Sequence, residues 1–367
     1  MNRKSTRKRQ STQPLAVGTG LLALDEVTSA DRSTPVRYWA GGTCGNVLIA
    51  LRYLSWNTQP IARLADDRAT ELLLNDLRRW RVSERFIRVE EDGSTPIIVH
   101  RITKDSEGRM KHSFSWRCAS CGARYPGYKP ELVTVAESIV PKLKNVSVFF
   151  FDRVSAAAIA LAKSAAEHGA LVTFEPSSIG NPILFRQAWE ISHVVKYSHE
   201  RLSDFPELDV QSNPRLLIET LGDSGLRYRW RTPRRRTDTW VESKALSVDG
   251  VRDTAGSGDW CTAGLLSKIA ANGFKGFSKS TEQQIAEAIR FGQALAAWNC
   301  QFEGARGGMY AVSKKQFERQ ISELLSGSGK VIPATTDNGL KSSSASGVCK
   351  VCEYSISRSE RKHSKTK

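Results

Sequence analysis

The chain of 367 residues has no run of 18 or more apolar residues, about the length that a helix needs to cross a bilayer. We therefore expect no transmembrane helix and no membrane partner. Its start has part of the outline of a secretory signal, with basic residues up to Arg9 and an apolar stretch from Leu15 to Leu24. Gly18 and Gly20 interrupt that stretch, and no small-residue cleavage site follows. We interpret the apolar stretch as a β-strand.

Acidic residues are scarce, with 38 against 54 basic ones, and the net charge is +16. This excess raises the question of a nucleic-acid partner. Much of the excess lies in residues 1–10 and 350–367, where basic side chains are usually solvated. Six arginines also lie among aromatic residues in 227–236, a pattern that can bind nucleic acid by stacking on bases but is also found in a solvent-facing hairpin. An anionic small molecule also favours a basic surface, so we expect no nucleic-acid partner.

The chain has seven cysteines, an odd number, so they cannot all be paired in disulfides within the chain. Four of them form two C-x-x-C pairs, Cys118 with Cys121 and Cys349 with Cys352. Structural zinc needs four ligands, and two distant pairs can close one site because loop entropy grows slowly with length. A redox pair or unrelated surface cysteines are the alternatives, and His112 is a possible replacement ligand.

The length and the 40% hydrophobic content allow a large core, in two domains or in one α/β domain with a small accessory element. We expect a disordered basic tail over residues 1–13 and a folded domain over 14–325. Residues 326–367 would be a Ser/Gly-rich linker and a basic tail. Within the domain, the apolar run 146–151 predicts a strand buried on both faces. An Ala-rich helix and a second strand would complete a β-α-β unit.

The stretch from Asp253 to Trp260 carries the clearest chemistry. Small residues between two carboxylates, followed by an amphipathic segment from Cys261, predict a tight loop that opens onto a helix. Free N–H groups and the positive end of the helix dipole would bind an anion there, and Gly256 and Gly258 would let a phosphate approach closely. Asp259 is placed to accept a proton from a nucleophile. A simple helix cap is the alternative.

A second motif, from Gly41 to Val47, predicts a glycine turn that runs into a helix buried on one face. Together the two motifs resemble the signatures of the PfkB, or ribokinase-like, family of sugar and nucleoside kinases, and the resemblance extends from about Ala16 to Gly308. It implies a three-layer α/β fold with a mostly parallel sheet flanked by helices. It also implies a small β lid, with elements near 25–45 and 94–125.

The resemblance implies a role for each matching residue. Substrate hydroxyls would be bound by Asp25, Gly41, Gly42 and Asn46. The catalytic group would comprise Asp259 with Gly256, Ser257 and Gly258. ATP would be bound by Thr220, Gly222, Gly225, Ala255 and Glu200, the last of these through Mg²⁺. A turn aspartate, a capping asparagine and a surface glutamate are the plain alternatives for Asp25, Asn46 and Glu200.

We therefore predict a cytoplasmic kinase that transfers the γ-phosphate of ATP to a hydroxyl of a sugar or nucleoside, with a homodimer through the lid as a possible assembly. Asp259 would be the general base, and the backbone from Gly256 to Gly258 would stabilise the phosphate charge. The alternative is a ribokinase-like regulatory or scaffold protein with little activity and a zinc-stabilised lid. The sequence does not specify the substrate.

Overall fold

The computed structural model describes residues 13–31, 33–107, 110–202, 214–231, 239–327 and 348–352. The basic tails and most of the Ser/Gly-rich linker therefore lie outside the described residues. Within them, no helix is long and apolar enough to cross a bilayer.

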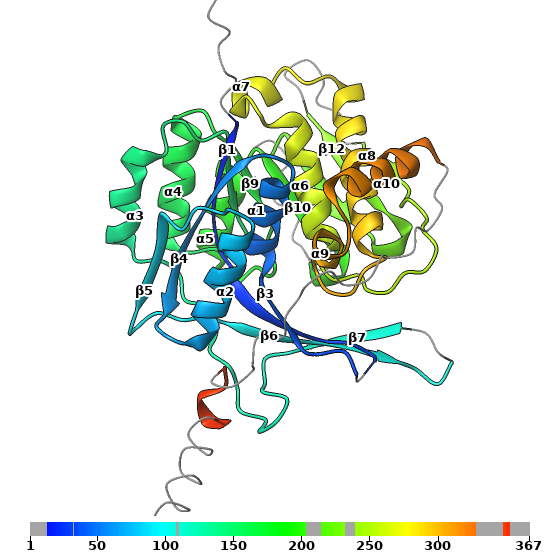
Figure 1. Ribbon diagram of the computed structural model, residues 1–367. Helices are drawn as coiled ribbons and strands as arrows, with labels where there is room; N and C mark the ends of the chain where they lie inside the picture. Colours follow the sequence, from blue (N-terminus) through cyan, green and yellow to red (C-terminus); the bar gives the residue numbers. More distant parts are fainter. Residues whose placement is uncertain are drawn as a thin grey trace, which may run out of the picture.

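A nine-stranded sheet forms the centre of the protein (Figure 1). Its strands, in spatial order, are β13 (Val241–Ser243), β12 (Leu226–Trp230), β11 (Leu216–Thr220), β10 (Val194–Ser198), β9 (Leu171–Phe174), β8 (Val148–Phe151), β1 (Leu15–Thr19), β4 (Asn57–Ala65) and β5 (Phe86–Glu90). All neighbours from β11 to β5 are parallel, whereas β12 runs antiparallel to both of its neighbours. The predicted mostly parallel sheet is confirmed.

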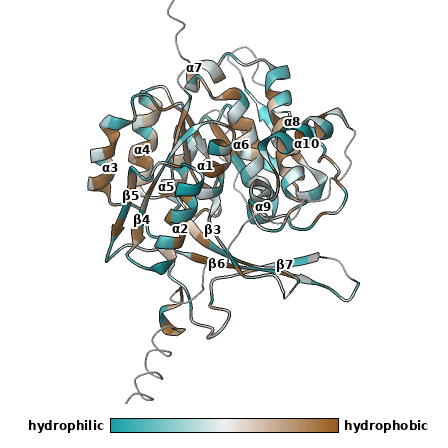
Figure 2. Ribbon diagram, viewed as in Figure 1, coloured by the Kyte–Doolittle hydropathy of each residue, from teal (hydrophilic) through white to brown (hydrophobic). Residues whose placement is uncertain are grey.

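Helices cover both faces of this sheet. The helices are α1 (Thr43–Tyr53), α2 (Arg68–Arg79), α3 (Val133–Ile139), α4 (Ala156–Glu167), α5 (Pro182–Ile191), α6 (Ser257–Ile269), α7 (Gly273–Phe277), α8 (Glu282–Asn299), α9 (Gly307–Ala311) and α10 (Lys314–Ser326). Short 3₁₀ turns are η1 (Val140–Lys142), η2 (His199–Arg201) and η3 (Gly222–Ser224). Apolar faces turn towards the sheet and polar faces outwards (Figure 2).

The packing of strand β8 shows how the sheet comes to lie between two layers of helices. All four of its residues are buried, and successive side chains of a strand point to opposite faces. Phe149 and Phe151 pack in the core under α3, α4 and α5, whereas Val148 and Phe150 pack in the core that contains α1, α6 and α8. The expected β-α-β unit is confirmed as β8, α4 and β9, with β8 and β9 parallel.

A second sheet of four strands forms a flat layer against one end of the domain (Figure 1). Its order is β3 (Arg37–Gly41), β2 (Ala23–Thr28), β6 (Ile97–Lys104) and β7 (Met110–Ser115), and we call it the lid. The single strand predicted from Leu15 to Leu24 is wrong. The chain leaves the large sheet at Gly20, where φ is 139° and an added Cβ would lie 1.7 Å from a carboxylate oxygen of Asp152.

Candidate active site

The N-terminus of α6 forms the centre of the candidate site. The helix predicted from Cys261 already starts at Ser257, because Gly256 before it adopts a left-handed φ of 72°. A Cβ on Gly256 would lie 2.3 Å from the carbonyl oxygen of Ala305, so only glycine fits this turn. The first turn of α6 therefore begins with Ser257, Gly258 and Asp259.

The backbone N–H groups of this loop divide into two sets. The N–H of Ala255 donates to Oδ1 of Asp253, at 2.9 Å, and that of Ser257 donates to a carbonyl within the loop. In the part of the chain that the structure describes, the N–H groups of Gly256, Gly258 and Asp259 donate to no protein acceptor. An anion at this helix terminus would meet these free donors.

The carboxylate of Asp259 lies in the first turn of α6, partly buried. Its Oδ2 accepts a hydrogen bond of 2.7 Å from the side-chain amide of Asn46. Burial raises the pKa of Asp259 from 3.8 to about 8, and the negative charge of Glu175 adds to the rise, whereas the Asn46 hydrogen bond and Lys196 oppose it. A general base works best when its pKa is close to the working pH, so this environment suits proton transfer.

Asp25 lies on β2 of the lid, with 9% of its surface exposed. Its carboxylate accepts no hydrogen bond from any described residue, and burial raises its pKa to about 7, although Arg306 opposes the rise. Gly41 leaves room for this carboxylate, because a Cβ there would lie 2.1 Å from Oδ2 of Asp25. Gly42, with φ of 78°, turns the chain into α1. Buried without a partner, Asp25 is suited to accept hydrogen bonds from a ligand.

Arg306 is a central residue that the sequence did not indicate. Its side chain is 1% exposed, and its Nε donates to Oδ1 of Asn46 at 3.0 Å. Its Nη2 donates to Asp76 at 2.9 Å and to the carbonyl of Ala40. The arginine follows the Gly304-Ala305 pair directly, but an isolated arginine usually indicates an exposed position.

A turn at the end of β11 forms the other side of the candidate site. Thr220 ends β11, and two residues later Gly222 begins η3 with a φ of 62°. Gly225, directly after η3, adopts a φ of 105°. Strands β10 and β11 pair in parallel, which brings Glu200 in η2 to the same edge. Oε1 of Glu200, an exposed residue, lies 3.9 Å from the position of a Cβ on Gly222. The structure thus brings together Thr220, both glycines and Glu200.

Glu175 and Lys196 form a buried ion pair beside Asp259, which sequence analysis missed. Glu175 follows β9, and its second carboxylate oxygen accepts a hydrogen bond of 2.6 Å from Thr262. Its place directly after a buried parallel strand was the available signal, since ligands bind at the carboxyl ends of such strands.

The lid contacts the loop before α6. Nε2 of His112, on β7, lies 3.2 Å from the hydroxyl of Thr254, and Nε2 of His100 lies 3.4 Å from Oδ2 of Asp253. His112 therefore belongs to this contact. It does not belong to the cysteine group, which contains Cys118, Cys121, Cys349 and Cys352 with all four sulfurs within 4.8 Å of one another.

An α/β fold that places a carboxylate beside free N–H groups at a helix N-terminus is an arrangement that phosphotransferases use. The profile of the pfkB family of carbohydrate kinases matches residues 19–311, and the chain belongs to this family. It is 25% identical over 314 residues to the probable fructokinase-4 of Arabidopsis thaliana. The aligned region covers 78% of this chain and 87% of that protein.

Solved structures show the same fold. A fructokinase from Xylella fastidiosa with bound ATP has a TM-score of 0.62 and 18% identity, covering 85% of this chain and 97% of that one. The ribokinase of Arabidopsis thaliana, complexed with ribose and ATP, has a TM-score of 0.60 and 17% identity. The match covers 86% of this chain and 99% of that one. The predicted family and the predicted ribokinase-like fold are therefore confirmed.

Proposed function

We propose that this carbohydrate kinase transfers the γ-phosphate of ATP to a hydroxyl of a sugar, with Asp259 as the general base. The observation that carries the proposal is the position of Asp259 in the same helical turn as the unpaired N–H group of Gly258. The base and the anion donors then face one reaction centre. The proposed cytoplasmic location and the homodimer through the lid are not needed for this chemistry.

The transfer requires one bond to form and one to break. The sugar oxygen attacks the γ-phosphorus while the bond from that phosphorus to the β–γ bridging oxygen breaks, and ADP leaves. The hydroxyl proton passes to Asp259. The N–H groups of Gly256 and Gly258 would bind the charge on the phosphate oxygens. General-base help contributes about 10²–10⁴-fold and a lost anion donor costs about 10²–10³-fold, so neither suffices alone.

The same geometry supports the other assignments. The unpartnered carboxylate of Asp25 would accept hydrogen bonds from sugar hydroxyls, with Gly41 and Gly42 providing room beside it. Thr220, Gly222 and Gly225 would lie along the phosphates of ATP. Glu200 would hold Mg²⁺ through water, since its exposed carboxylate at this turn is the oxygen ligand that Mg²⁺ prefers. Bound Mg²⁺ would neutralise phosphate charge.

A panel of sugars and nucleosides, assayed for ADP release, tests the proposal. We expect one sugar to be phosphorylated far faster than the nucleosides, because three plant proteins of similar sequence are named as fructokinases. Nucleoside turnover would overturn the sugar assignment. If no acceptor raised ADP release above the background hydrolysis of ATP, the regulatory or scaffold alternative would replace the kinase.

A further inference from the structure

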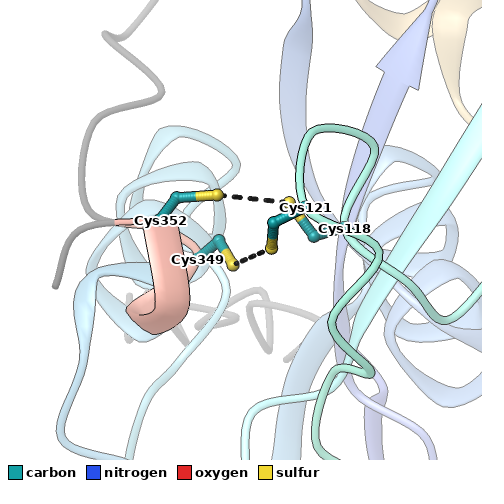
Figure 3. A group of neighbouring side chains, drawn as sticks. All are labelled: Cys118, Cys121, Cys349 and Cys352. Carbon is teal, nitrogen blue, oxygen red and sulfur yellow. Dashed lines mark hydrogen bonds between the residues drawn. The ribbon is translucent and has the colours of Figure 1, made fainter. Parts of the chain in front are cut away.

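The sulfur atoms of the two C-x-x-C pairs converge between the loop after β7 and the C-terminal segment 348–352 (Figure 3). Sγ of Cys118 lies 3.8 Å from Sγ of Cys352, and Sγ of Cys121 lies 3.6 Å from Sγ of Cys349. Tetrahedral Zn²⁺ with bonds of about 2.3 Å holds its sulfurs about 3.8 Å apart. We propose that these four cysteines bind a structural Zn²⁺ ion that fastens the C-terminal segment to the lid.

The pairing across the two segments argues against unrelated surface thiols. Each short sulfur–sulfur distance joins one cysteine of the first pair to one of the second, so neither pair forms the group alone. A disulfide would need a separation of about 2.05 Å, and all the cysteines are free. The four sulfurs have the spacing of ligands around one ion.

Both pairs form turns that direct backbone donors at a sulfur. The N–H groups of Ser120 and Cys121 point at the sulfur of Cys118. Those of Val351 and Cys352 point in the same way at the sulfur of Cys349. Outer donors of this kind orient the ligand atoms of a metal site. Two such turns that face each other are typical of a four-thiolate metal site.

The first turn is fixed by its own backbone. The N–H of Cys118 donates to the carbonyl of Ala123 at 2.8 Å, and that of Gly122 donates to the carbonyl of Cys118 at 3.0 Å. Gly122 has φ of 72°, which glycine adopts without strain. The N–H of Tyr125, a buried residue, donates to the carbonyl of Trp116 at 2.8 Å. The turn is therefore preorganised to present both sulfurs.

The donor set selects the metal and its role. Four thiolates in tetrahedral arrangement favour zinc or iron over magnesium and calcium. Four protein ligands leave no open position for a substrate or water, so the ion would be structural. All four ligands are sulfur atoms, so this site would not compete for the Mg²⁺ that is proposed to bind at Glu200, because Mg²⁺ prefers oxygen ligands.

The C-terminal segment also contacts the main domain. Val348 is buried in the larger core, and Nζ of Lys350 lies 3.5 Å from Oδ2 of Asp67, the residue that caps α2. The surface ion pair contributes little by itself, because both solvent and salt screen it. Zinc would therefore link this segment to the loop after β7 more strongly than the ion pair links it to α2, and its binding energy would stabilise the folded arrangement.

Metal analysis of the full-length protein tests the proposal. The protein is purified with a thiol reductant and without chelator, and zinc and iron are measured per chain. We expect about one zinc in the unmodified protein and in two matched controls, Lys350→Ala in the same segment and Cys300→Ser outside the group. The double variant Cys349→Ser/Cys352→Ser keeps two ligands only, and its zinc content should fall at least tenfold after dialysis.

Iron in place of zinc, an absence of both metals, or undiminished zinc in the double variant would overturn the proposal. A second measurement does not depend on how that variant folds. The unmodified protein is stripped with a chelator and titrated with Co²⁺, and one equivalent should produce thiolate-to-cobalt charge-transfer bands and the d–d bands of a tetrahedral ion. Absence of these bands, or octahedral ones, would also overturn it. Both measurements read the metal and not the transfer reaction, so they are independent of the proposed activity.

Discussion

The side-chain amide of Asn46 donates a 2.7 Å hydrogen bond to Asp259, although 213 positions separate the two residues in the sequence. Arg306 determines the orientation of this amide. An arginine side chain can only donate, so the Asn46 oxygen must face Arg306 and the amide NH₂ group must face Asp259. The motif from Gly41 to Val47 and the motif from Asp253 to Trp260 are therefore joined through one oriented side chain.

Asn46→Ala tests this link. The hydrogen bond from Asn46 lowers the pKa of Asp259, so its loss should raise that pKa further. We expect the acidic limb of the kcat/KM profile to move to higher pH and turnover at pH 7 to fall about tenfold. Turnover measured from pH 5 to 9 decides this. A uniform loss with an unmoved limb would mean that Asn46 supports the fold alone.

Asp259→Asn removes the proposed base and keeps the shape of the side chain. Turnover should fall at least ~10²-fold, the low end of general-base catalysis, while ATP affinity stays within about twofold. Steady-state assays and calorimetric titration with an ATP analogue measure the two quantities. A much smaller loss of turnover on the best substrate would exclude Asp259 as the base.

Asp25→Ala should weaken sugar binding and leave ATP binding nearly unchanged. A lost hydrogen bond to a charged group costs about 1.5–3 kcal/mol, which is about a 10- to 150-fold loss of affinity. The binding of both ligands is measured by titration calorimetry. Equal effects on sugar and ATP would assign Asp25 a role in the fold and not in sugar binding.

Asp25 should also lower the stability of the unliganded protein at neutral pH. Its folded pKa of about 7 lies above the ordinary value of 3.8, so between these values the folded state holds a proton that the unfolded state releases. The free energy of unfolding therefore falls as the pH rises through this window.

An asparagine at position 25 does not titrate, so Asp25→Asn avoids the cost of burying a charged carboxylate at high pH. We expect this variant to be more stable than the unmodified protein at pH 8 by over about 1 kcal/mol, which corresponds to a pKa shift of roughly one unit. The gain should shrink towards pH 4. Urea unfolding at both pH values measures it, with Asp66→Asn, at an exposed position, as the control. A gain that is the same at both pH values would contradict the assignment.

The sequence predicted the parts of the site that rest on local chain chemistry. The loop into α6 was predictable because its glycines and carboxylates are contiguous, and the strand β8 because it is apolar throughout. Arg306 and Lys196 were not, since arginine and lysine usually lie at the surface and become buried only beside partners distant in sequence. The break at Gly20 was missed because it depends on the carboxylate of Asp152.

The last prediction concerns the C-terminal segment and the lid. Truncation after residue 339 removes Cys349 and Cys352, and the loop after β7 then loses its proposed anchor. His112 on β7 contacts Thr254 in the loop before α6, so a looser lid should hold the sugar less well. We expect the KM for the sugar to rise up to about tenfold, equal to about 1.4 kcal/mol, and the KM for ATP to change less. Lys350→Ala is the control that keeps all four cysteines. Equal increases in both KM values, or no increase, would show that the segment has no connection with sugar binding.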